Sequence, residues 1–235
     1  MPALAVETRA LGKTFGLTPV LHGTDFSVEM GRAATIVGAN GSGKSTLLAI
    51  LAGLIAPTEG CAMVFDADTR KFGPNERRRI GMLSHQSFLY PSLTAHENLE
   101  FYGRLYGLSD PRRSADAWLE RVGLADSANE RVRAFSRGME QRLAAARAML
   151  HGPSLLLLDE PFAALDVDGV ARLKSLLRSA IEDGCSMIAT AHLPLEVEGI
   201  EFESYEIVRG QVVPYKSKDE GRRGRLRSLL APRSQ

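Results

Sequence analysis

The chain has 235 residues, of which 44% are hydrophobic and 24% are charged, with a formal net charge of +1. This composition is typical of a globular protein with a full core, and its charge balance disfavours a large nucleic-acid-binding surface. The two cysteines, Cys61 and Cys185, lie far apart, so neither a disulfide framework nor a zinc site is indicated. Because no apolar run approaches about 18 residues, we expect no membrane-spanning helix.

The first elements expected along the chain are strands. Alternating polar and apolar residues between positions 5 and 31 predict antiparallel strands, and residues 35–37 predict a short buried strand. Residues 61–65 and 80–83 predict two more strands. A buried helix is expected after residue 43 from its apolar residues Leu47, Leu48, Ile50, Leu51 and Leu54.

Between the strand at 35–37 and this helix the chain matches the pattern G-x-x-x-x-G-K-[ST]. The matching stretch consists of Gly38, Ala39, Asn40, Gly41, Ser42, Gly43, Lys44, Ser45 and Thr46. Glycines permit the dihedrals that point consecutive N–H groups inward, and the positive end of the helix dipole strengthens the attraction for a phosphate. Lys44 can reach the terminal phosphates of a nucleotide, and Ser45 can place its hydroxyl on a bridging Mg²⁺. A chance glycine-rich turn is the alternative, and the flanking strand and helix disfavour it.

In the middle of the chain, apolar residues recur at the spacing of an α-helix. Thr94 and Glu97 have the spacing of a capping box, which predicts the start of a helix. One face of that helix is expected to carry Leu99, Tyr102, Leu105 and Tyr106. A second helix is expected from Ser114 to near Gly123. A third is expected to carry an apolar stripe of Met139, Leu143, Ala146 and Leu150.

Four leucines at 155–158 predict a fully buried strand of a parallel sheet, and Asp159 and Glu160 follow it. Ligands of open α/β sheets bind outside the carboxyl ends of the strands, so we expect both carboxylates beside the phosphate-binding loop. Asp159 is suited to hold the Mg²⁺ through water, and Glu160 to orient and deprotonate a water that attacks the γ-phosphate. The alternative is that both carboxylates cap a helix. Another strand is expected at 187–191.

These motifs resemble those of the ATP-binding cassette (ABC) ATPases, in the same order and across nearly the whole chain. Residues 38–46 match the Walker A motif of that family, residues 155–160 its Walker B motif, and residues 135–142 its signature segment. The resemblance implies nucleotide-binding roles for six more residues. They are Phe15, which would stack on adenine, the Q-loop glutamine Gln86, Ser136 and Gly138 of the signature, Asp166 of the D-loop, and the switch histidine His192.

The signature departs from the commonest form, L-S-G-G-Q, because Arg137 and Met139 replace a glycine and the glutamine. Ser136 keeps the alternative of a plain N-cap. Phe15, which replaces the usual tyrosine, and His192 each keep the alternative of an ordinary core residue. No ligand role is expected for His85, His96 and His151.

The resemblance implies a P-loop NTPase core of the α/β class with an N-terminal antiparallel β subdomain. An α-helical subdomain at about residues 92–150 would be inserted in this core. The ATPase domain is expected to span residues 1–215. The remaining residues, 216–235, form a basic tail that would be solvated or would contact anionic lipid headgroups.

The activity implied is hydrolysis of ATP with Mg²⁺. The catalytic residues would be Lys44, Glu160 and His192, and the metal contacts would be Ser45, Gln86 and Asp159. Two ATPase subunits would pair head to tail, as a homodimer or pseudo-dimer, on the cytoplasmic side of the inner membrane. A separate integral membrane permease would be their partner.

The form of the signature and of the segment after Gln86 resembles exporters. This resemblance favours export of haem for c-type cytochrome maturation, or multidrug or polysaccharide export. Two other interpretations are a soluble ABC protein that acts on nucleic acid or ribosomes, and a regulatory module that no longer turns over ATP. The balanced charge disfavours the first, and the presence of Glu160 with His192 disfavours the second.

Overall fold

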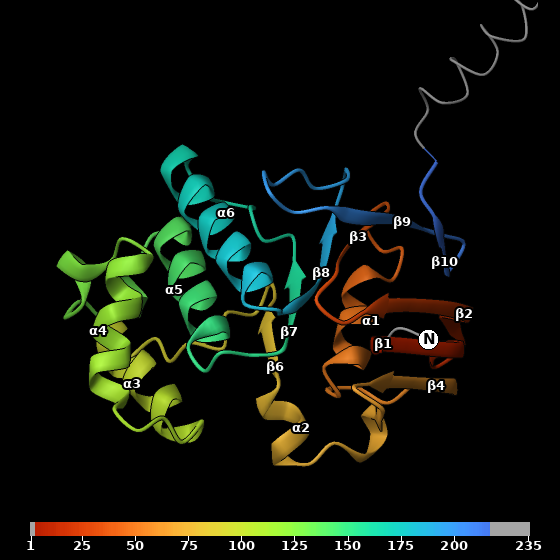
Figure 1. Cartoon of the computed structure of the whole chain (residues 1–235), viewed down its shortest axis with the longest axis horizontal. Helices are drawn as coiled ribbons and strands as arrows, with labels where there is room; N and C mark the ends of the chain where they lie inside the picture. The colour runs from red at the N-terminus through yellow and green to blue at the C-terminus, as the bar shows by residue number, and fades with distance from the viewer. Residues whose placement is uncertain (1–2, 217–235) are drawn as a thin grey trace, which may run out of the picture.

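The computed structural model describes residues 3–216, so residues 217–235 of the expected basic tail lie outside the described part. Two sheets and a group of helices form the molecule (Figure 1). Helices α3 and α4 lie at one end, and strands β1, β2 and β4 lie at the other (Figure 1). This arrangement agrees with the expected α/β core that carries an antiparallel β part and a helical part.

The smaller sheet is antiparallel, as expected, with the strand order β2-β1-β4-β5. Its strands are β1 (Leu4–Phe15), β2 (Thr18–Glu29), β4 (Glu59–Val64) and β5 (Ala67–Asp68). Inward-facing residues such as Leu11, Leu21 and Phe26 pack in one apolar cluster with helix α1 (Lys44–Leu51). The sheet therefore covers the phosphate-binding loop and its helix on one side.

The larger sheet has the order β10-β9-β3-β8-β7-β6, and its strands from β9 to β6 run parallel. Its strands are β3 (Ala33–Val37), β6 (Ile80–Leu83), β7 (Leu155–Asp159), β8 (Ser186–Ala191), β9 (Phe202–Val208) and the antiparallel edge strand β10 (Gln211–Pro214). Leu155 and Leu157 of β7 pack in the cluster with α1, whereas Leu156 and Leu158 pack in a second cluster with α5 and α6. Burial on both faces explains why β7 is apolar at each position from Leu155 to Leu158 rather than at alternate ones.

The three helices expected in the middle of the chain are present as α3, α4 and α5, and α2 and α6 are found in addition. They are α2 (Pro74–Arg78), α3 (Ala95–Leu105), α4 (Pro111–Arg121), α5 (Arg137–Met149) and α6 (Val167–Glu182), with short 3₁₀ turns at Thr69–Lys71, Ala125–Ser127 and Val132–Ala134. The capping box at α3 is confirmed, because Thr94 Oγ1 accepts from the Glu97 N–H and Glu97 Oε2 accepts from the Thr94 N–H. The limits of the expected helical subdomain, 92–150, stay a prediction.

Three local expectations were wrong. Helix α4 begins at Pro111 instead of Ser114, because Asp110 caps it by accepting from the Arg113 N–H at 3.1 Å. Leu105 is exposed because α3 ends there. Leu54 is also exposed, because α1 ends at Leu51 and the chain turns away at Gly53, whose φ is 66°.

His151 is held between the helical part and the parallel sheet. Its ring stacks on Tyr106, with 3.8 Å between the ring centroids, and its Nε2 lies 3.3 Å from the carbonyl oxygen of Ile80. Burial lowers the pKa of His151 from 6.5 to about 4. The folded protein therefore keeps this imidazole neutral at pH values at which the unfolded chain protonates it.

We expect the free energy of unfolding to fall by about 2 kcal/mol between pH 7 and pH 5 through His151 alone. The sign follows because the unfolded chain binds a proton in this range and the folded chain does not. Urea unfolding at both pH values measures the change, and His151→Phe should show a smaller pH dependence than the parent. Equal pH dependence in the two proteins would contradict this assignment.

Candidate functional site

The carboxyl ends of β3, β6, β7 and β8 lie at the same edge of the parallel sheet. The phosphate-binding loop follows β3, His85 follows β6, Glu160 follows β7 and His192 follows β8. A cavity of about 290 Å³ opens beside the loop. It is lined by Val20, Asn40, Gly41, Gly43, Lys44, Ser45, Thr46, His85 and Glu160.

The glycines of the phosphate-binding loop allow its backbone to pack closely against neighbouring side chains. A Cβ atom on Gly38 would lie 2.7 Å from Ser42 Oγ, and one on Gly43 would lie 2.9 Å from Leu21 Cδ2. Gly43 is the N-cap of α1 with a φ of 109°, and no side chain caps this helix. The N–H groups of its first turn therefore point into the cavity without a side-chain acceptor, which is the arrangement that binds anions.

Lys44 supplies a buried cation to the loop. Its side chain is 6% exposed, and its Nζ donates to the carbonyl oxygens of Gly38 at 2.8 Å and Ala39 at 3.1 Å. The same atom lies 4.0 Å from Glu160 Oε1. The ammonium therefore lies in the space that the loop encloses, where a phosphate would bind.

The two carboxylates after β7 have different surroundings. Asp159 is 3% exposed, and its Oδ1 accepts from Thr190 Oγ1 at 2.5 Å. The Glu160 N–H donates to Thr190 Oγ1 at 3.2 Å, and the Glu160 side chain reaches the cavity. Neither carboxylate caps a helix, because Asp166 caps the following helix α6. The alternative assignment is therefore wrong.

Thr190 was not recognised in the sequence. Its place in the site depends on the register between β7 and β8, in which Asp159 pairs with Thr190. Its hydroxyl donates to the Asp159 carboxylate and accepts from the Glu160 N–H, so one side chain orients both residues. A polar residue inside the otherwise apolar strand expected at 187–191 was the available signal.

His192 lies beside Glu160, with 3.4 Å between His192 Nε2 and Glu160 Oε1. Its side chain is 60% exposed, so it is not the core histidine of the alternative interpretation. The ammonium of Lys44 and the imidazole of His192 therefore both lie beside one oxygen atom of the Glu160 carboxylate, Oε1, and the three side chains form one group. Such a group can bind a phosphate and control a water molecule beside it.

The sequence model of the ABC transporter family matches residues 21–163. The chain belongs to this family. It is 31% identical to the linearmycin resistance ATP-binding protein LnrL of Bacillus subtilis (strain 168), over 92% of this chain and 70% of that protein. It is 35% identical to the Nod factor export ATP-binding protein I of Cupriavidus pinatubonensis, over 84% of this chain and 62% of that protein.

A solved ATP-binding cassette has the same fold. Its structure is a dimer in a post-hydrolysis state bound to ADP and Pi, and it has a TM-score of 0.80 and 29% identity to this chain. The match covers 88% of this chain and 96% of that cassette. The protein is thus an ATP-binding and ATP-hydrolysing subunit of the ABC transporter family, and its expected fold class is confirmed.

None of the six residues assigned by resemblance lines the cavity beside the Walker A loop, although His192 lies beside Glu160, which does. Ser136 Oγ caps α5 by accepting from the Met139 N–H at 3.2 Å, and Asp166 Oδ1 caps α6 by accepting from the Gly169 N–H at 2.8 Å. A Cβ on Gly138 would lie 3.1 Å from the Ala164 carbonyl oxygen, so the signature packs against the D-loop. Phe15 is 49% exposed, which excludes a core role. Their contacts with nucleotide stay predictions.

The Q-loop differs from the expectation. His85 lines the cavity, and its Nε2 lies 3.4 Å from Asp159 Oδ2. The expectation for His85 was that it has no ligand role, and this stays a prediction, because lining the cavity does not test it. Gln86 is exposed and lines none of the cavities described here, although its carbonyl oxygen accepts from Ser84 Oγ at 2.8 Å. Adjacent side chains after a strand point in different directions, and only the folded chain decides which one faces the site.

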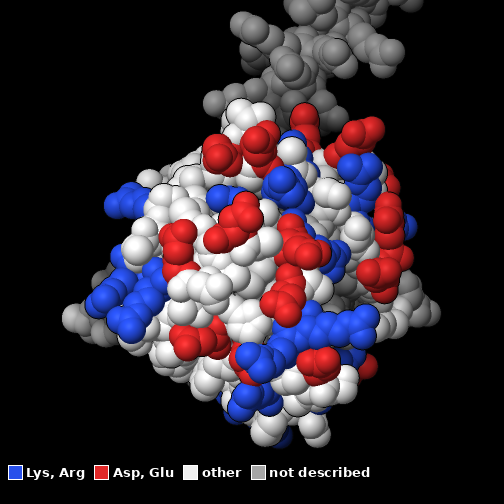
Figure 2. Space-filling model, turned by 90° about the vertical axis from the view of Figure 1, so that its left-hand side faces the viewer, with Lys and Arg blue, Asp and Glu red and all other residues white. Residues whose placement is uncertain are grey.

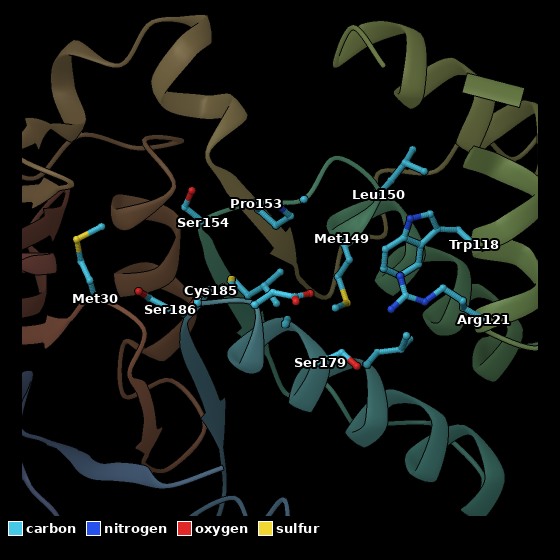
Figure 3. A pocket seen from close by; sticks show the side chains of 16 residues that line it. Met30, Trp118, Arg121, Met149, Leu150, Pro153, Ser154, Ser179, Cys185 and Ser186 are labelled. Atoms are coloured by element: carbon cyan, nitrogen blue, oxygen red, sulfur yellow. Dashed lines mark hydrogen bonds between the residues drawn. The ribbon is translucent and has the colours of Figure 1, made fainter. Parts of the chain in front are cut away.

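The structure has further cavities, one beside this site and one at the opposite edge of the parallel sheet. A cavity of about 340 Å³ shares His85 and Glu160 with the first and reaches Arg137, one of the two residues that depart from the common signature. A third, of about 490 Å³, lies between α4, α5, α6 and the amino-terminal ends of β7 and β8 (Figure 3). Trp118 and Met149 point into it, and none of the expected site residues lines it.

We expect Lys44→Ala to weaken ATP binding at least about tenfold, because it removes the buried cation from the Walker A loop. Isothermal titration with a non-hydrolysable ATP analogue measures the affinity. Lys71→Ala is the matched control, because Lys71 is exposed and lines no cavity described here. An affinity within a few-fold of the parent would contradict the role assigned to Lys44.

Proposed function

We propose that this chain is the ATPase subunit of an ABC exporter whose membrane-spanning part is a separate permease chain. The observation that supports it best is the convergence of Lys44, Glu160 and His192 beside the Walker A loop. None of the helices within residues 3–216 is both long and apolar enough to span a bilayer. The proposal places the subunit at the cytoplasmic face of the membrane, bound to the permease.

In the proposed reaction the Walker A backbone N–H groups and Lys44 bind the β- and γ-phosphates of ATP. Glu160 Oε1 accepts a proton from a water that attacks the γ-phosphorus, and the bond from this phosphorus to the β–γ bridging oxygen breaks, so that ADP and phosphate are formed. His192 positions this water and the γ-phosphate. Before ATP binds, Lys44 Nζ donates to Gly38 and Ala39 carbonyl oxygens. ATP binding would exchange these contacts for contacts with phosphate oxygens.

The side chains near the Walker A loop include oxygen donors that are suited to bind an Mg²⁺ ion. Ser45 is an exposed hydroxyl at the first turn of α1, and Asp159 is a buried carboxylate without a Lys or Arg partner among residues 3–216. Such oxygen donors are the ligands that Mg²⁺ prefers. When bound, the ion would neutralise charge on the phosphate oxygens. Ser45 and Asp159 would hold it, directly or through water.

The signature would act on the nucleotide of a second ATPase subunit. In a single chain, Ser136 is exposed at the amino-terminal end of α5 and does not line the cavity beside its own Walker A loop. A head-to-tail dimer would bring Ser136 and Gly138 of one chain to the γ-phosphate bound by the other. ATP would thereby join two subunits, and hydrolysis would release them.

Export, as opposed to import, is favoured by the names of the relatives. One of them is named for Nod factor export and another for linearmycin resistance. Haem export for c-type cytochrome maturation stays a prediction from sequence resemblance alone, because neither name concerns haem. Drug export fits the relative named for linearmycin resistance better.

Two rival functions find less support. On the face that carries α3 and α4, acidic and basic side chains are interspersed, without a single basic stripe for nucleic acid (Figure 2). A regulatory module without turnover would not need Glu160 and His192 side by side. Co-purification with a multi-span membrane protein tests the transporter assignment.

We expect Glu160→Gln to bind ATP normally and to hydrolyse it roughly 10²–10⁴-fold more slowly, because the general base is lost. The variant should accumulate as an ATP-bound dimer. Phosphate release and size-exclusion chromatography measure the two effects, with Glu182→Gln on α6 as the control. Parental turnover in Glu160→Gln would show that the base lies elsewhere.

The head-to-tail arrangement predicts that two inactive variants complement each other. Lys44→Ala damages the half of a site in its own chain, and Ser136→Glu damages the half that acts on the partner's nucleotide. A mixed dimer then has one intact site and one site with both lesions. We expect mixing to restore vanadate-trapped nucleotide that neither variant retains alone.

The control combines both substitutions in one chain and pairs it with an unmodified chain, and the mixed dimer is isolated through a different affinity tag on each chain, so that unmodified homodimers are removed. Each site then carries one lesion, and we expect no trapping. Trapping in this control, together with none in the first mixture, would place Ser136 at the site of its own chain.

A further inference from the structure

The largest of the three cavities described above, of about 490 Å³, lies apart from the nucleotide-binding site. Leu156 of β7 and Ser186 of β8 line it, near the amino-terminal ends of these strands. Glu160 and His192 follow the carboxyl ends of the same two strands. A cavity of this size can enclose a small organic molecule, and a molecule bound there would not touch the nucleotide.

Buried apolar side chains form much of the inner wall of this cavity. Met149, Leu156 and Leu176 line it and are 6%, 0% and 7% exposed. Trp118 of α4 and Met149 of α5 point into it (Figure 3). An indole ring and a thioether are polarisable and pack well against aromatic groups, so the wall suits the apolar body of a ligand.

Three helices end at this cavity. Arg121 is the last residue of α4, Met149 is the last residue of α5, and Asp183 is the C-cap of α6, and all three line the cavity. The carboxyl end of a helix carries a partial negative charge. Three such ends around one cavity therefore favour a ligand with a positive charge.

The charged side chains of the lining do not reverse this preference. The Arg121 guanidinium lies over the Trp118 ring, with 4.3 Å between its Cζ and the ring centroid, which shows that this indole accepts a cation. The negative charge of Asp183 offsets the positive charge of Arg121, so the helix ends decide the sign. Asp183 is exposed, so the charged centre of a ligand beside it would stay in contact with water while the apolar body is buried.

We propose that this cavity is a binding site for amphipathic organic cations, in which a positive centre is attached to an aromatic or aliphatic body. The body packs against Trp118 and Met149, and the positive centre faces Asp183 at the end of α6. The ligand thereby contacts α4 of the helical part and α5 and α6 at the same time. This site goes beyond the proposed function and does not depend on it.

The experiment uses the fluorescence of Trp118, which is the only tryptophan of the chain. The full chain, without nucleotide, is titrated with tetraphenylphosphonium and separately with tetraphenylborate, an anion of nearly the same size and shape. We expect the cation to change the emission of Trp118 in a saturable manner. It should bind at least about tenfold more tightly than the anion, and isothermal titration should give the same ratio.

Two variants test the position of the ligand. Asp183→Asn should weaken binding of the cation by roughly three- to tenfold, because it removes the carboxylate beside the positive centre, and should not weaken binding of the anion. Glu182→Gln is the matched control, because Glu182 is exposed, precedes Asp183 and does not line the cavity, and it should bind the cation as the parent does. Ala180→Phe should fill the cavity and abolish binding, with circular dichroism to check that the variant is folded.

The absence of saturable binding of tetraphenylphosphonium to the parent overturns the proposal. Equal affinity for the two ions, or tighter binding of the anion, overturns the preference for cations. Parental affinity for the cation in both Asp183→Asn and a folded Ala180→Phe variant shows that the ion binds elsewhere. None of these measurements involves ATP, so the site can fail while ATP hydrolysis remains intact, and the proposed function can fail while the site is confirmed.

Discussion

The site depends on a parallel sheet that is buried on both faces. Alternate leucines of β7 pack on opposite sides, Leu155 and Leu157 toward α1, and Leu156 and Leu158 toward α5 and α6. With both faces covered, polar side chains are accommodated where the strands end. The four strands β3, β6, β7 and β8 end at one edge, and each is followed there by a residue of the site.

Charged side chains are concentrated at this edge of the sheet, and a few hydrogen bonds hold them in place. Lys44 and Asp159 are almost fully buried, and each is held by hydrogen bonds within the protein. Glu160 is held at its backbone by Thr190, while its side chain stays accessible to Lys44 and His192. One carboxylate is therefore fixed and suited to a metal, and its neighbour is free to act on water. The division of roles follows from burial and from one threonine hydroxyl.

The described chain also separates two sets of groups that the proposed reaction needs. The Walker A loop and Glu160 line one cavity, whereas Ser136 is exposed at the start of α5. Capping of α5 by Ser136 leaves other N–H groups of its first turn without an intrahelical acceptor. An exposed helix N-terminus of this kind is suited to a phosphate that arrives on another subunit. This separation supports a reaction that requires two subunits.

The sequence alone determined the features that depend on neighbours a few residues away. The Walker A loop, the capping box at Thr94 and Glu97 and the buried strand of four leucines are local patterns, because dihedral preference, helix capping and burial period act over short distances. Tertiary structure decided which residues of different strands meet. The contact of Thr190 with Asp159 follows from strand register, and the position of His85 beside Asp159 follows from the direction of the chain after β6. Both depend on hydrogen bonds between strands that lie far apart in the sequence, which no local pattern encodes.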